Sequence, residues 1–388
     1  MISRYIKGIG LLVGMLFGAG IFALPYTFSR AGLFWGIFHF FLAFFILIFL
    51  HFWYAEIAYY TKGKHRFTGY AEIFLGVRAK FLAFLSTLFS YYGSLLIYGI
   101  LGGIFLANIF TSFSILQTTV LFFIVAGFLT LGGLEKAAVI NFYLTIPLFG
   151  FVVYLLFVSL PSVNINNFLI NNKIFTLDWF LPYGVWIFAL GCTSVIPEVR
   201  DIFAKIPIKN FKRTIWISIV LSAIFYFLFI ISVWGVSGTF TTEDAISGLV
   251  NILGRTAFII GSLIGFLAVF TSYIAMAIDM KYVFRYDYKI KPIWAWICSI
   301  VPPAILYFLG IHDFVKTIGI IGSVGIGIFG IFVILIRHSM HKKLIEGGNE
   351  KLVAPTNGEF IKRRYFLEFI VLSGILAGVF YEIFRIIL

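Results

Sequence analysis

Long apolar runs alternate with short polar segments along almost the whole chain of 388 residues. A helix needs about 20 apolar residues to cross the hydrocarbon core of a membrane. Two neighbouring apolar runs touch at residues 135 and 136. Residues 239–255 are too polar to cross, so we expect an outer loop there, with a short helix from about Thr242. The pattern predicts an all-α membrane protein of about eleven spans, over residues 5–30, 33–60, 81–110, 118–134, 135–160, 179–203, 212–237, 256–284, 292–310, 313–337 and 364–388.

The composition fits a protein whose solvent is largely lipid. The chain is 61% hydrophobic and 12% charged, about half the charge of an ordinary soluble domain, and it contains 49 Phe, 20 Tyr and 8 Trp residues. A net charge of +13 would suggest a nucleic-acid partner in a soluble protein. Here the basic excess is expected in cytoplasmic loops, so no nucleic-acid partner is predicted. The two cysteines, Cys192 and Cys298, lie in apolar runs and indicate neither a disulfide framework nor a zinc site.

Lysine and arginine orient the predicted spans, because cytoplasmic loops of membrane proteins carry an excess of both. With the N-terminus inside and the C-terminus outside, 24 of the 29 basic residues lie on the cytoplasmic side. The polar stretch 338–363 then forms a cytoplasmic linker before the last span. The five basic residues left on the outer side are Arg30, Lys173, Arg255, Lys316 and Arg385.

Two of the predicted spans carry helix-breaking residues at matching depths. The first contains Gly18-Ala19-Gly20 and then Pro25, and the sixth contains Gly191 with Pro197 six residues later. Glycines at 10, 14 and 18 could serve only close helix packing. The paired breaks indicate more, since interrupted helices in corresponding halves of a membrane protein mark transporter binding sites.

Five spans separate the starts of these two helices, and an odd number inverts orientation. The chain is therefore expected to be one transmembrane domain with two inverted five-helix repeats, about 1–160 and 179–337, followed by an extra helix over about 364–388.

The helix dipoles at the breaks suggest the charge of a ligand. Free N–H groups near Ala19, Gly20 and Ile21 present a positive end to an anion. Carbonyl groups over residues 186–189, from Trp186 to Ala189, present a negative end to a cation. A zwitterion such as an amino acid would satisfy both ends.

At these residues the sequence resembles a known family. The segment Gly18-Ala19-Gly20-Ile21-Phe22-Ala23-Leu24-Pro25-Tyr26, followed by Ala31-Gly32, is similar to the opening motif of the amino acid/auxin permease family, close in style to bacterial tryptophan/tyrosine permeases. The resemblance implies a LeuT-like fold with the substrate held mid-membrane between helices one, three, six and eight. The backbone of Gly18, Ala19, Gly20 and Ile21 would meet the carboxylate, and carbonyls before Gly191 the amine. Cys192 and a helix-three tyrosine, Tyr92, would face the substrate side chain, although Tyr91, Tyr92 and Tyr98 could equally be packing residues.

The coupling ion stays open between Na⁺ and H⁺. By resemblance to sodium-coupled relatives, a cation would lie among the backbone and side-chain oxygens of Gly14, Phe17, Ala268, Thr271 and Ser272, although Ser and Thr often bond back to their own helix. The proton candidates are His51 and Glu198, ionisable residues within predicted spans, although both lie on the cytoplasmic side of centre, where snorkelling or a gate could equally explain them. A cytoplasmic gate is expected to pair Arg4 or Lys7 with Asp279 or Asp287.

These features predict a symporter of amino acids in the cytoplasmic membrane, driven by Na⁺ or H⁺ and without a cofactor. No cluster of catalytic residues at one depth, no HExxH motif and no phosphate-binding loop indicates an enzyme. A protein of the same fold that senses amino acids without transporting them is the alternative.

Overall fold

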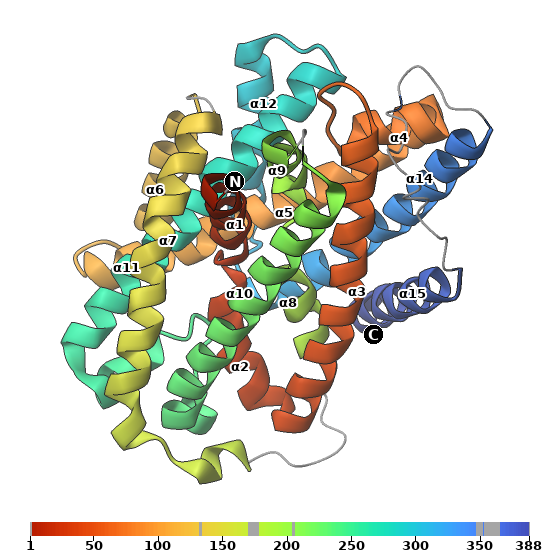
Figure 1. Cartoon of the computed structure of the whole chain (residues 1–388). Coiled ribbons are helices and arrows are strands. Elements are labelled where there is room, and N and C mark those ends of the chain that lie inside the picture. The colour runs from red at the N-terminus through yellow and green to blue at the C-terminus, as the bar shows by residue number, and fades with distance from the viewer. Residues whose placement is uncertain are drawn as a thin grey trace.

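The computed structural model describes residues 2–131, 134–169, 178–203, 206–346, 352 and 365–387, which are almost entirely helical. Figure 1 shows a bundle in which the two halves of the first span lie near the centre. The α-helices are α1 (Ile2–Leu16), α2 (Gly20–Ala31), α3 (Leu33–Tyr60), α4 (Phe67–Leu75), α5 (Val77–Ile109), α6 (Ile115–Leu129), α7 (Leu134–Ser159), α8 (Leu181–Ala189), α9 (Ile196–Phe203), α10 (Ile208–Ser237), α11 (Val250–Tyr282), α12 (Pro292–Phe308), α13 (Phe314–Ile320), α14 (Gly327–Ile345) and α15 (Tyr365–Ile387).

The first predicted span is interrupted, as expected from its glycines. Helix α1 ends at Leu16, α2 begins at Gly20, and the two helices meet at 49°. Glycine gains little from helical structure, and neighbouring helices can satisfy the backbone groups that a break exposes within a membrane. The predicted break near residues 18–20 is confirmed.

The sixth predicted span is interrupted in the same way. Helix α8 ends at Ala189, a short 3₁₀ turn η3 covers Thr193–Val195, and α9 begins at Ile196. Pro197 lies in the first turn of α9, where proline is tolerated because that backbone N–H would have no acceptor within the helix. The discontinuity predicted near residues 189–193 is also confirmed.

The number of membrane passes remains a prediction. Six described helical segments are long and apolar enough to cross a membrane, or seven when α1 and α2 are taken as one bent span. The predicted span 33–60 matches α3, whereas α4 falls within what was expected to be a plain loop. The expected helix from about Thr242 is instead a 3₁₀ turn, η5 (Ser247–Leu249), which leads into α11.

Several basic positions that orient the predicted spans lie outside the described residues. They include Lys173 and Lys205 and most of the linker 338–363, namely residues 347–351 and 353–363. The side chain of Lys136 is also outside the described part. In Figure 1 the ends of α3 and α9 lie together at the top, and the turn between α2 and α3 lies at the bottom, which agrees with the predicted alternation of sides.

Helices α8 and α13 meet through their backbones. A π-helical stretch, η7 (Ile321–Ile326), joins α13 to α14. A Cβ atom added at Gly184 would lie 2.4 Å from the carbonyl oxygen of Gly319, and one added at Gly322 would lie 1.9 Å from that of Gly184. Only glycine allows this approach, so α8, the first half of the sixth predicted span, packs directly on the backbone of α13 and η7, which belong to the tenth predicted span.

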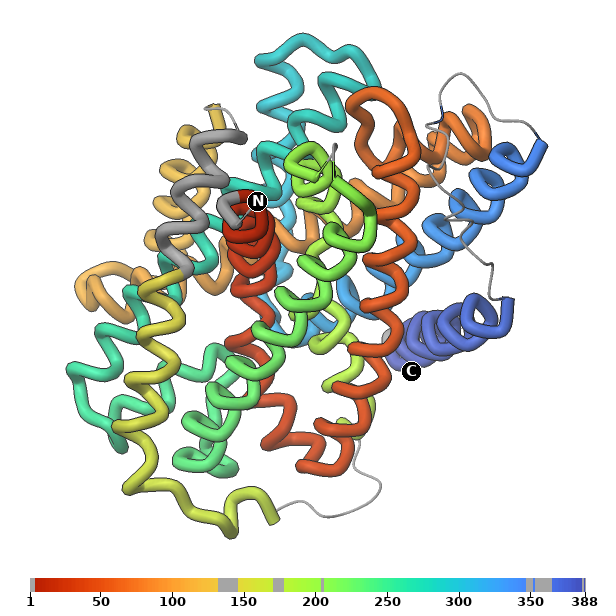
Figure 2. Tube along the Cα trace, viewed as in Figure 1, coloured from red at the N-terminus to blue at the C-terminus, as the bar shows by residue number. Residues whose placement is uncertain are grey.

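The extra helix α15 packs against the bundle beside α14 and α3 (Figure 2). Tyr183 of α8 donates a hydrogen bond to the carbonyl oxygen of Gly374 at 3.0 Å, and the rings of Phe180 and Tyr381 lie 4.0 Å apart. A group of four charged residues joins the other end of α15 to the bundle. This Glu56 cluster consists of Glu56, Lys212, Arg337 and Glu368.

Candidate functional site

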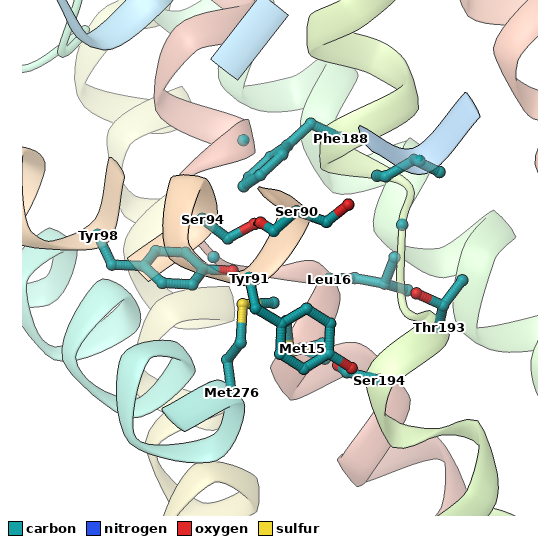
Figure 3. Close-up of a pocket in the computed structure, with 14 residues that line it drawn as sticks. Met15, Leu16, Ser90, Tyr91, Ser94, Tyr98, Phe188, Thr193, Ser194 and Met276 are labelled. Carbon is teal, nitrogen blue, oxygen red and sulfur yellow. The ribbon is translucent and has the colours of Figure 1, made fainter. Parts of the chain in front are cut away.

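A cavity lies between the two interrupted helices, where the predicted binding site was expected. Its volume of about 40 Å³ is room for a few water molecules, so an amino acid requires the lining to move apart. Figure 3 shows side chains of α1, α5, α8, η3 and α11 around this space. The lining residues are Met15, Leu16, Gly18, Gly20, Ser90, Tyr91, Ser94, Tyr98, Phe188, Gly191, Thr193, Ser194, Met276 and Ile326.

The first break contributes Gly18 and Gly20 to the cavity wall. The first N–H groups of a helix have no acceptor within it, so the start of α2 at Gly20 gives the wall a positive end. Ala19 and Ile21 are buried and are not part of the lining. Of the four residues expected to bind the carboxylate, only Gly18 and Gly20 therefore lie in the cavity wall, where they present backbone.

Gly20 packs directly against the end of α8. A Cβ atom added there would lie 2.5 Å from the Cα atom of Ala189, so a larger residue would push the end of α8 away. A Cβ atom added at Gly18 would lie 3.1 Å from Tyr98 and 3.2 Å from the hydroxyl of Ser272, both of which are side-chain contacts. Gly20 serves packing, whereas Gly18 faces groups that could move.

At the second break, Phe188 and Gly191 line the cavity, and the end of α8 is partly satisfied by protein groups. The carbonyl oxygen of Trp186 accepts from the N–H of Leu190 at 3.0 Å, and that of Ala189 accepts from the hydroxyl of Tyr226 at 2.9 Å. Trp186 is fully buried, and its indole N–H donates to the carbonyl oxygen of Gly36. The carbonyl oxygen of Phe188 accepts from the N–H of Gly191 at 3.0 Å, so the carbonyl of Ile187 remains as the better candidate for a ligand amine.

Tyr226 of α10 links the ends of both broken helices. Its hydroxyl lies 2.5 Å from the carbonyl oxygen of Leu16, at the end of α1, and 2.9 Å from that of Ala189, at the end of α8. Neither carbonyl receives a hydrogen bond from an N–H of its own helix, because each helix ends there. One buried phenol therefore stabilises both breaks.

His51 of α3 satisfies a backbone donor at the second break. Its Nε2 atom accepts from the N–H of Cys192 at 3.0 Å, and its Nδ1 atom lies 2.5 Å from the carbonyl oxygen of Leu47. These contacts require the proton on Nδ1 and a lone pair on Nε2, which is the neutral form of the ring. The geometry gives His51 a role in capping the break. Cys192 is buried and is not part of the lining.

The tyrosines of the third predicted span, which is α5, divide between the cavity and the protein interior. Tyr91 and Tyr98 line the cavity (Figure 3). The hydroxyl of Tyr92 instead donates to the carbonyl oxygen of Cys298 at 2.7 Å, so Tyr92 faces α12. The expectation that Tyr92 faces the substrate is wrong. On a helix, adjacent residues point about 100° apart, and the sequence alone left the register open.

The predicted cation-binding residues meet only in part. The hydroxyl of Thr271 donates to the carbonyl oxygens of Leu267 and Ala268, at 3.0 and 3.1 Å, which is the back-bonding expected of threonine in a helix. Ser272 is fully buried, and its hydroxyl has no hydrogen-bond partner among the described residues.

On the α1 side of this set, Gly14 lies in the last turn of the helix, where carbonyls have no donor within the helix, and Phe17 lies just beyond its end. The carbonyls of Gly14 and Phe17 and the hydroxyl of Ser272 are therefore the oxygens that stay available to a cation.

On the side of the cavity toward the ends of α3 and α9, three charged residues form a buried group that we call the Arg66 cluster. The Nη2 atom of Arg66 lies 2.5 Å from Oε1 of Glu198, and its Nε atom lies 2.7 Å from Oδ1 of Asp279. Burial lowers the pKa of the Arg66 guanidinium, but the two carboxylates outweigh that effect and raise it above its usual range. The hydroxyl of Tyr91 donates to Oδ2 of Asp279 at 2.7 Å.

The predicted pairing of Asp279 with Arg4 or Lys7 is not found in this arrangement. Arg4 and Lys7 are exposed at the start of α1, and the cation beside Asp279 is Arg66, from the segment between α3 and α4. Asp287 accepts from the hydroxyl of Thr68 and from the N–H of Gly69, so it caps the first turn of α4. The sequence showed many basic residues in this loop and gave no sign that one of them turns inward.

The model of the tryptophan/tyrosine permease family matches residues 1–357, which is most of the chain. The chain belongs to that family. A search of curated proteins finds no match for the permease.

Solved structures of transporters share its fold. Mhp1, a nucleobase-cation-symport-1 family transporter with bound bromovinylhydantoin, is 13% identical, with a TM-score of 0.69, over 97% of the permease and 91% of that chain. A Na⁺-coupled sialic acid symporter in a substrate-bound outward-open state is 16% identical, with a TM-score of 0.62, over 98% and 89%. MhsT in complex with L-phenylalanine is 14% identical, with a TM-score of 0.63, over 97% and 98%.

These similarities confirm the predicted fold class, a LeuT-type membrane transporter with two discontinuous helices. The permease is a multi-pass membrane protein and a secondary transporter of a small molecule, and it is not an enzyme. Symporters among its structural neighbours are consistent with ion coupling.

Proposed function

We propose that the permease carries an amino acid with an aromatic or large apolar side chain across the cytoplasmic membrane, together with a coupling ion, Na⁺ or H⁺. The observation that carries this proposal is the cavity between the two breaks. It joins the positive start of α2 to the carbonyl end of α8, which suits the carboxylate and amine of one zwitterion.

The side chains around the cavity support the substrate class. Tyr91, Tyr98 and Phe188 offer aromatic surfaces, and Met15 and Met276 offer flexible thioethers that pack well against rings. Ser90, Ser94, Thr193 and Ser194 add hydroxyl groups that could bind polar atoms of the substrate. The family name and the L-phenylalanine bound to MhsT agree with this choice.

The proposed mechanism is alternating access around this cavity, with the N-terminus and the Arg66 cluster on the cytoplasmic side. Closure on that side would keep Arg66, Glu198 and Asp279 together, and opening would separate them. The two inverted repeats, about 1–160 and 179–337, would provide the two sets of helices that move relative to each other.

Purified permease in proteoliposomes tests the proposal. We expect uptake of labelled tryptophan, tyrosine or phenylalanine, competed by unlabelled aromatic amino acids and weakly by lysine or glutamate. Binding of labelled ligand to the detergent-solubilised protein, measured in parallel, identifies a sensor if binding occurs without uptake. If a full panel of amino acids gave no uptake and no binding, that result would contradict the proposed substrate class.

A further inference from the structure

The Arg66 cluster holds two carboxylates against one cation. The side chains of Arg66, Glu198 and Asp279 are 9%, 13% and 5% exposed, and both carboxylate oxygens of Glu198 are shielded from solvent. If both acids were ionised, the cluster would carry one uncompensated negative charge in a buried site. Two carboxylates that share such a site do not both ionise readily, so one of them holds a proton.

The Glu56 cluster shows that this protein can balance buried charges. There, Arg337 lies 2.6 Å from Glu56 and 2.6 Å from Glu368, and Lys212 also contacts Glu56. Two acids meet two cations, and no proton is needed. The imbalance at Arg66 is therefore a local property and not a general feature of the bundle.

The groups around the Arg66 cluster do not supply the missing positive charge. Arg200 pairs with Asp201 at 2.9 Å and donates to the carbonyl oxygen of Thr61, while Lys281 donates to that of Thr130. Asp287 adds a further acid nearby, contacted by Thr68 and Gly69 and, at its carbonyl, by Lys80. The other titratable neighbours, Tyr54, Tyr70, Tyr91 and Tyr282, are neutral phenols.

Contacts within the cluster distinguish the two acids. Asp279 has Arg66 on one oxygen and the hydroxyl of Tyr91 on the other, which stabilises its ionised form. Glu198 has the guanidinium near Oε1, and its hydrogen-bond donor among the described residues is its own backbone N–H, whereas Asp279 has both Tyr91 and Arg66. The shared proton therefore resides on Glu198.

Tyr91 connects the cluster to the substrate cavity. Its ring lines that cavity while its hydroxyl binds Asp279. A second small cavity shares Ser90, Tyr91, Thr193 and Ile326 with the first and extends to Tyr54 and Phe67, the residue after Arg66.

The second cavity is suited to water. The hydroxyls of Ser86 and Ser90 line it and have no hydrogen-bond partner among the described residues. Buried hydroxyls in a cavity are groups that water molecules satisfy, and water between the cavity and the cluster would conduct a proton.

We propose that the Arg66 cluster binds the proton that drives transport, with Glu198 as the carrier. This inference rests on the proposed function as a symporter. In the outward-facing state the Glu198 carboxylate takes a proton from water that enters through the substrate cavity. Closure then holds neutral Glu198 beside the Arg66–Asp279 pair. When the cytoplasmic side opens and the cluster separates, water removes the proton from Glu198. The carboxylate that remains pairs with Arg66 when that side closes again.

Two transport assays in proteoliposomes test the proposal. A pH gradient, acid outside, should drive accumulation of the labelled amino acid by the unaltered protein. In Glu198→Gln, which fixes the neutral form, accumulation should fall by roughly tenfold or more. Exchange of labelled for unlabelled substrate at equal pH should persist, because exchange needs no net proton movement. Asp201→Asn is the control, since that carboxylate lies three residues further on and is 43% exposed, and it should accumulate substrate normally.

Proton uptake on substrate binding provides an independent measurement. In weakly buffered detergent solution with a pH-indicator dye, substrate should make the unaltered protein take up protons, and Glu198→Gln should take up none while still binding. Accumulation by Glu198→Gln equal to that of the unaltered protein would overturn the proposal. So would binding without proton uptake by the unaltered protein between about pH 5 and 8, a result that stands even if the variant does not fold. Uptake driven only by Na⁺ overturns the proton site and leaves the proposed function intact, whereas no uptake at all contradicts the proposed function itself.

Discussion

The imidazole of His51 accepts a hydrogen bond from the backbone N–H of Cys192 at 3.0 Å. A side chain of α3 thereby completes the hydrogen bonding of a segment where α8 has ended and α9 has not begun. Buried backbone donors are almost always paired, so this contact is what allows a break at that depth.

Replacing His51 with leucine should destabilise the protein more than it changes coupling. The substitution leaves the N–H of Cys192 buried without an acceptor, which costs about 1–3 kcal/mol. Thermal unfolding in detergent measures the loss, and His51→Gln, whose amide oxygen can accept, should recover part of it. A leucine variant with unchanged stability and pH-independent uptake would instead identify His51 as a proton carrier.

Tyr226→Phe removes the hydroxyl shared by the carbonyls of Leu16 and Ala189. We expect a loss of about 0.5–1.5 kcal/mol in stability and a several-fold weaker apparent affinity for substrate, because both breaks lose a common contact. Tyr183→Phe is the matched control, since it removes a hydroxyl bonded to Gly374 of α15. That control should lose similar stability, measured by thermal unfolding, and keep the affinity in binding assays. Equal affinities in both variants would show that Tyr226 does not organise the site.

Gly20→Ala and Gly18→Ala should differ although they lie two residues apart. The new methyl at residue 20 meets the backbone of Ala189 at 2.5 Å, and such overpacking costs about 1–3 kcal/mol. At residue 18 it meets the side chains of Tyr98 and Ser272 instead, so folding should persist and substrate affinity should fall. Gly150→Ala, where nothing lies within 4 Å, is the control for both. Thermal unfolding and ligand binding of the three variants separate packing from recognition, and identical behaviour at 18 and 20 would contradict this division.

Replacing sodium with choline should leave uptake unchanged if a proton drives transport. The alternative is a sodium site at Ser272, whose buried hydroxyl has no partner among the described residues. In that case uptake would require sodium, and Ser272→Ala would raise the sodium concentration for half-maximal uptake. Thr271→Val would have a smaller effect, because the hydroxyl of Thr271 already bonds to its own helix.

Tyr91→Phe should separate substrate binding from coupling. The ring still lines the cavity, but Asp279 loses its hydrogen bond and competes with Glu198 for the shared proton. We expect binding within about twofold of the unaltered protein and a lower accumulation ratio under a pH gradient. Tyr98→Phe is the control from the same helix and cavity, and an equal accumulation ratio in both variants would exclude a coupling role for Tyr91.

The sequence predicted the features that depend on local chemistry. Glycines at 18, 20 and 191 weaken a helix wherever it packs, so both breaks could be located, and α3 was bounded by the polar residues on either side. The cavity then followed from placing the two breaks beside each other. The glycine signal could not distinguish Gly20, which packs on the backbone of Ala189, from Gly18, which meets the side chains of Tyr98 and Ser272.

Long-range contacts were not predictable from one chain. Arg66 is one of five basic residues between positions 62 and 80, and only the fold turns it toward Glu198 and Asp279. Tyr226 lies in a run of aromatic residues with no local sign that its hydroxyl reaches two helix ends. Partners more than 100 residues apart are set by tertiary packing, which sequence spacing does not encode.

The glycine contact between α8 and η7 has a kinetic consequence. Interlocked side chains must change rotamer before two helices can slide, and each such change adds to the barrier. Gly184, Gly319 and Gly322 present bare backbone to one another, and the side chain beside Gly184 is the small one of Ser323, so few rotamers have to change there. We expect α8, the first half of the sixth span, to shift along this interface with few side-chain rearrangements. The contacts of the Arg66 cluster, which must separate and form again, would then limit the speed of the transport cycle more than this surface does.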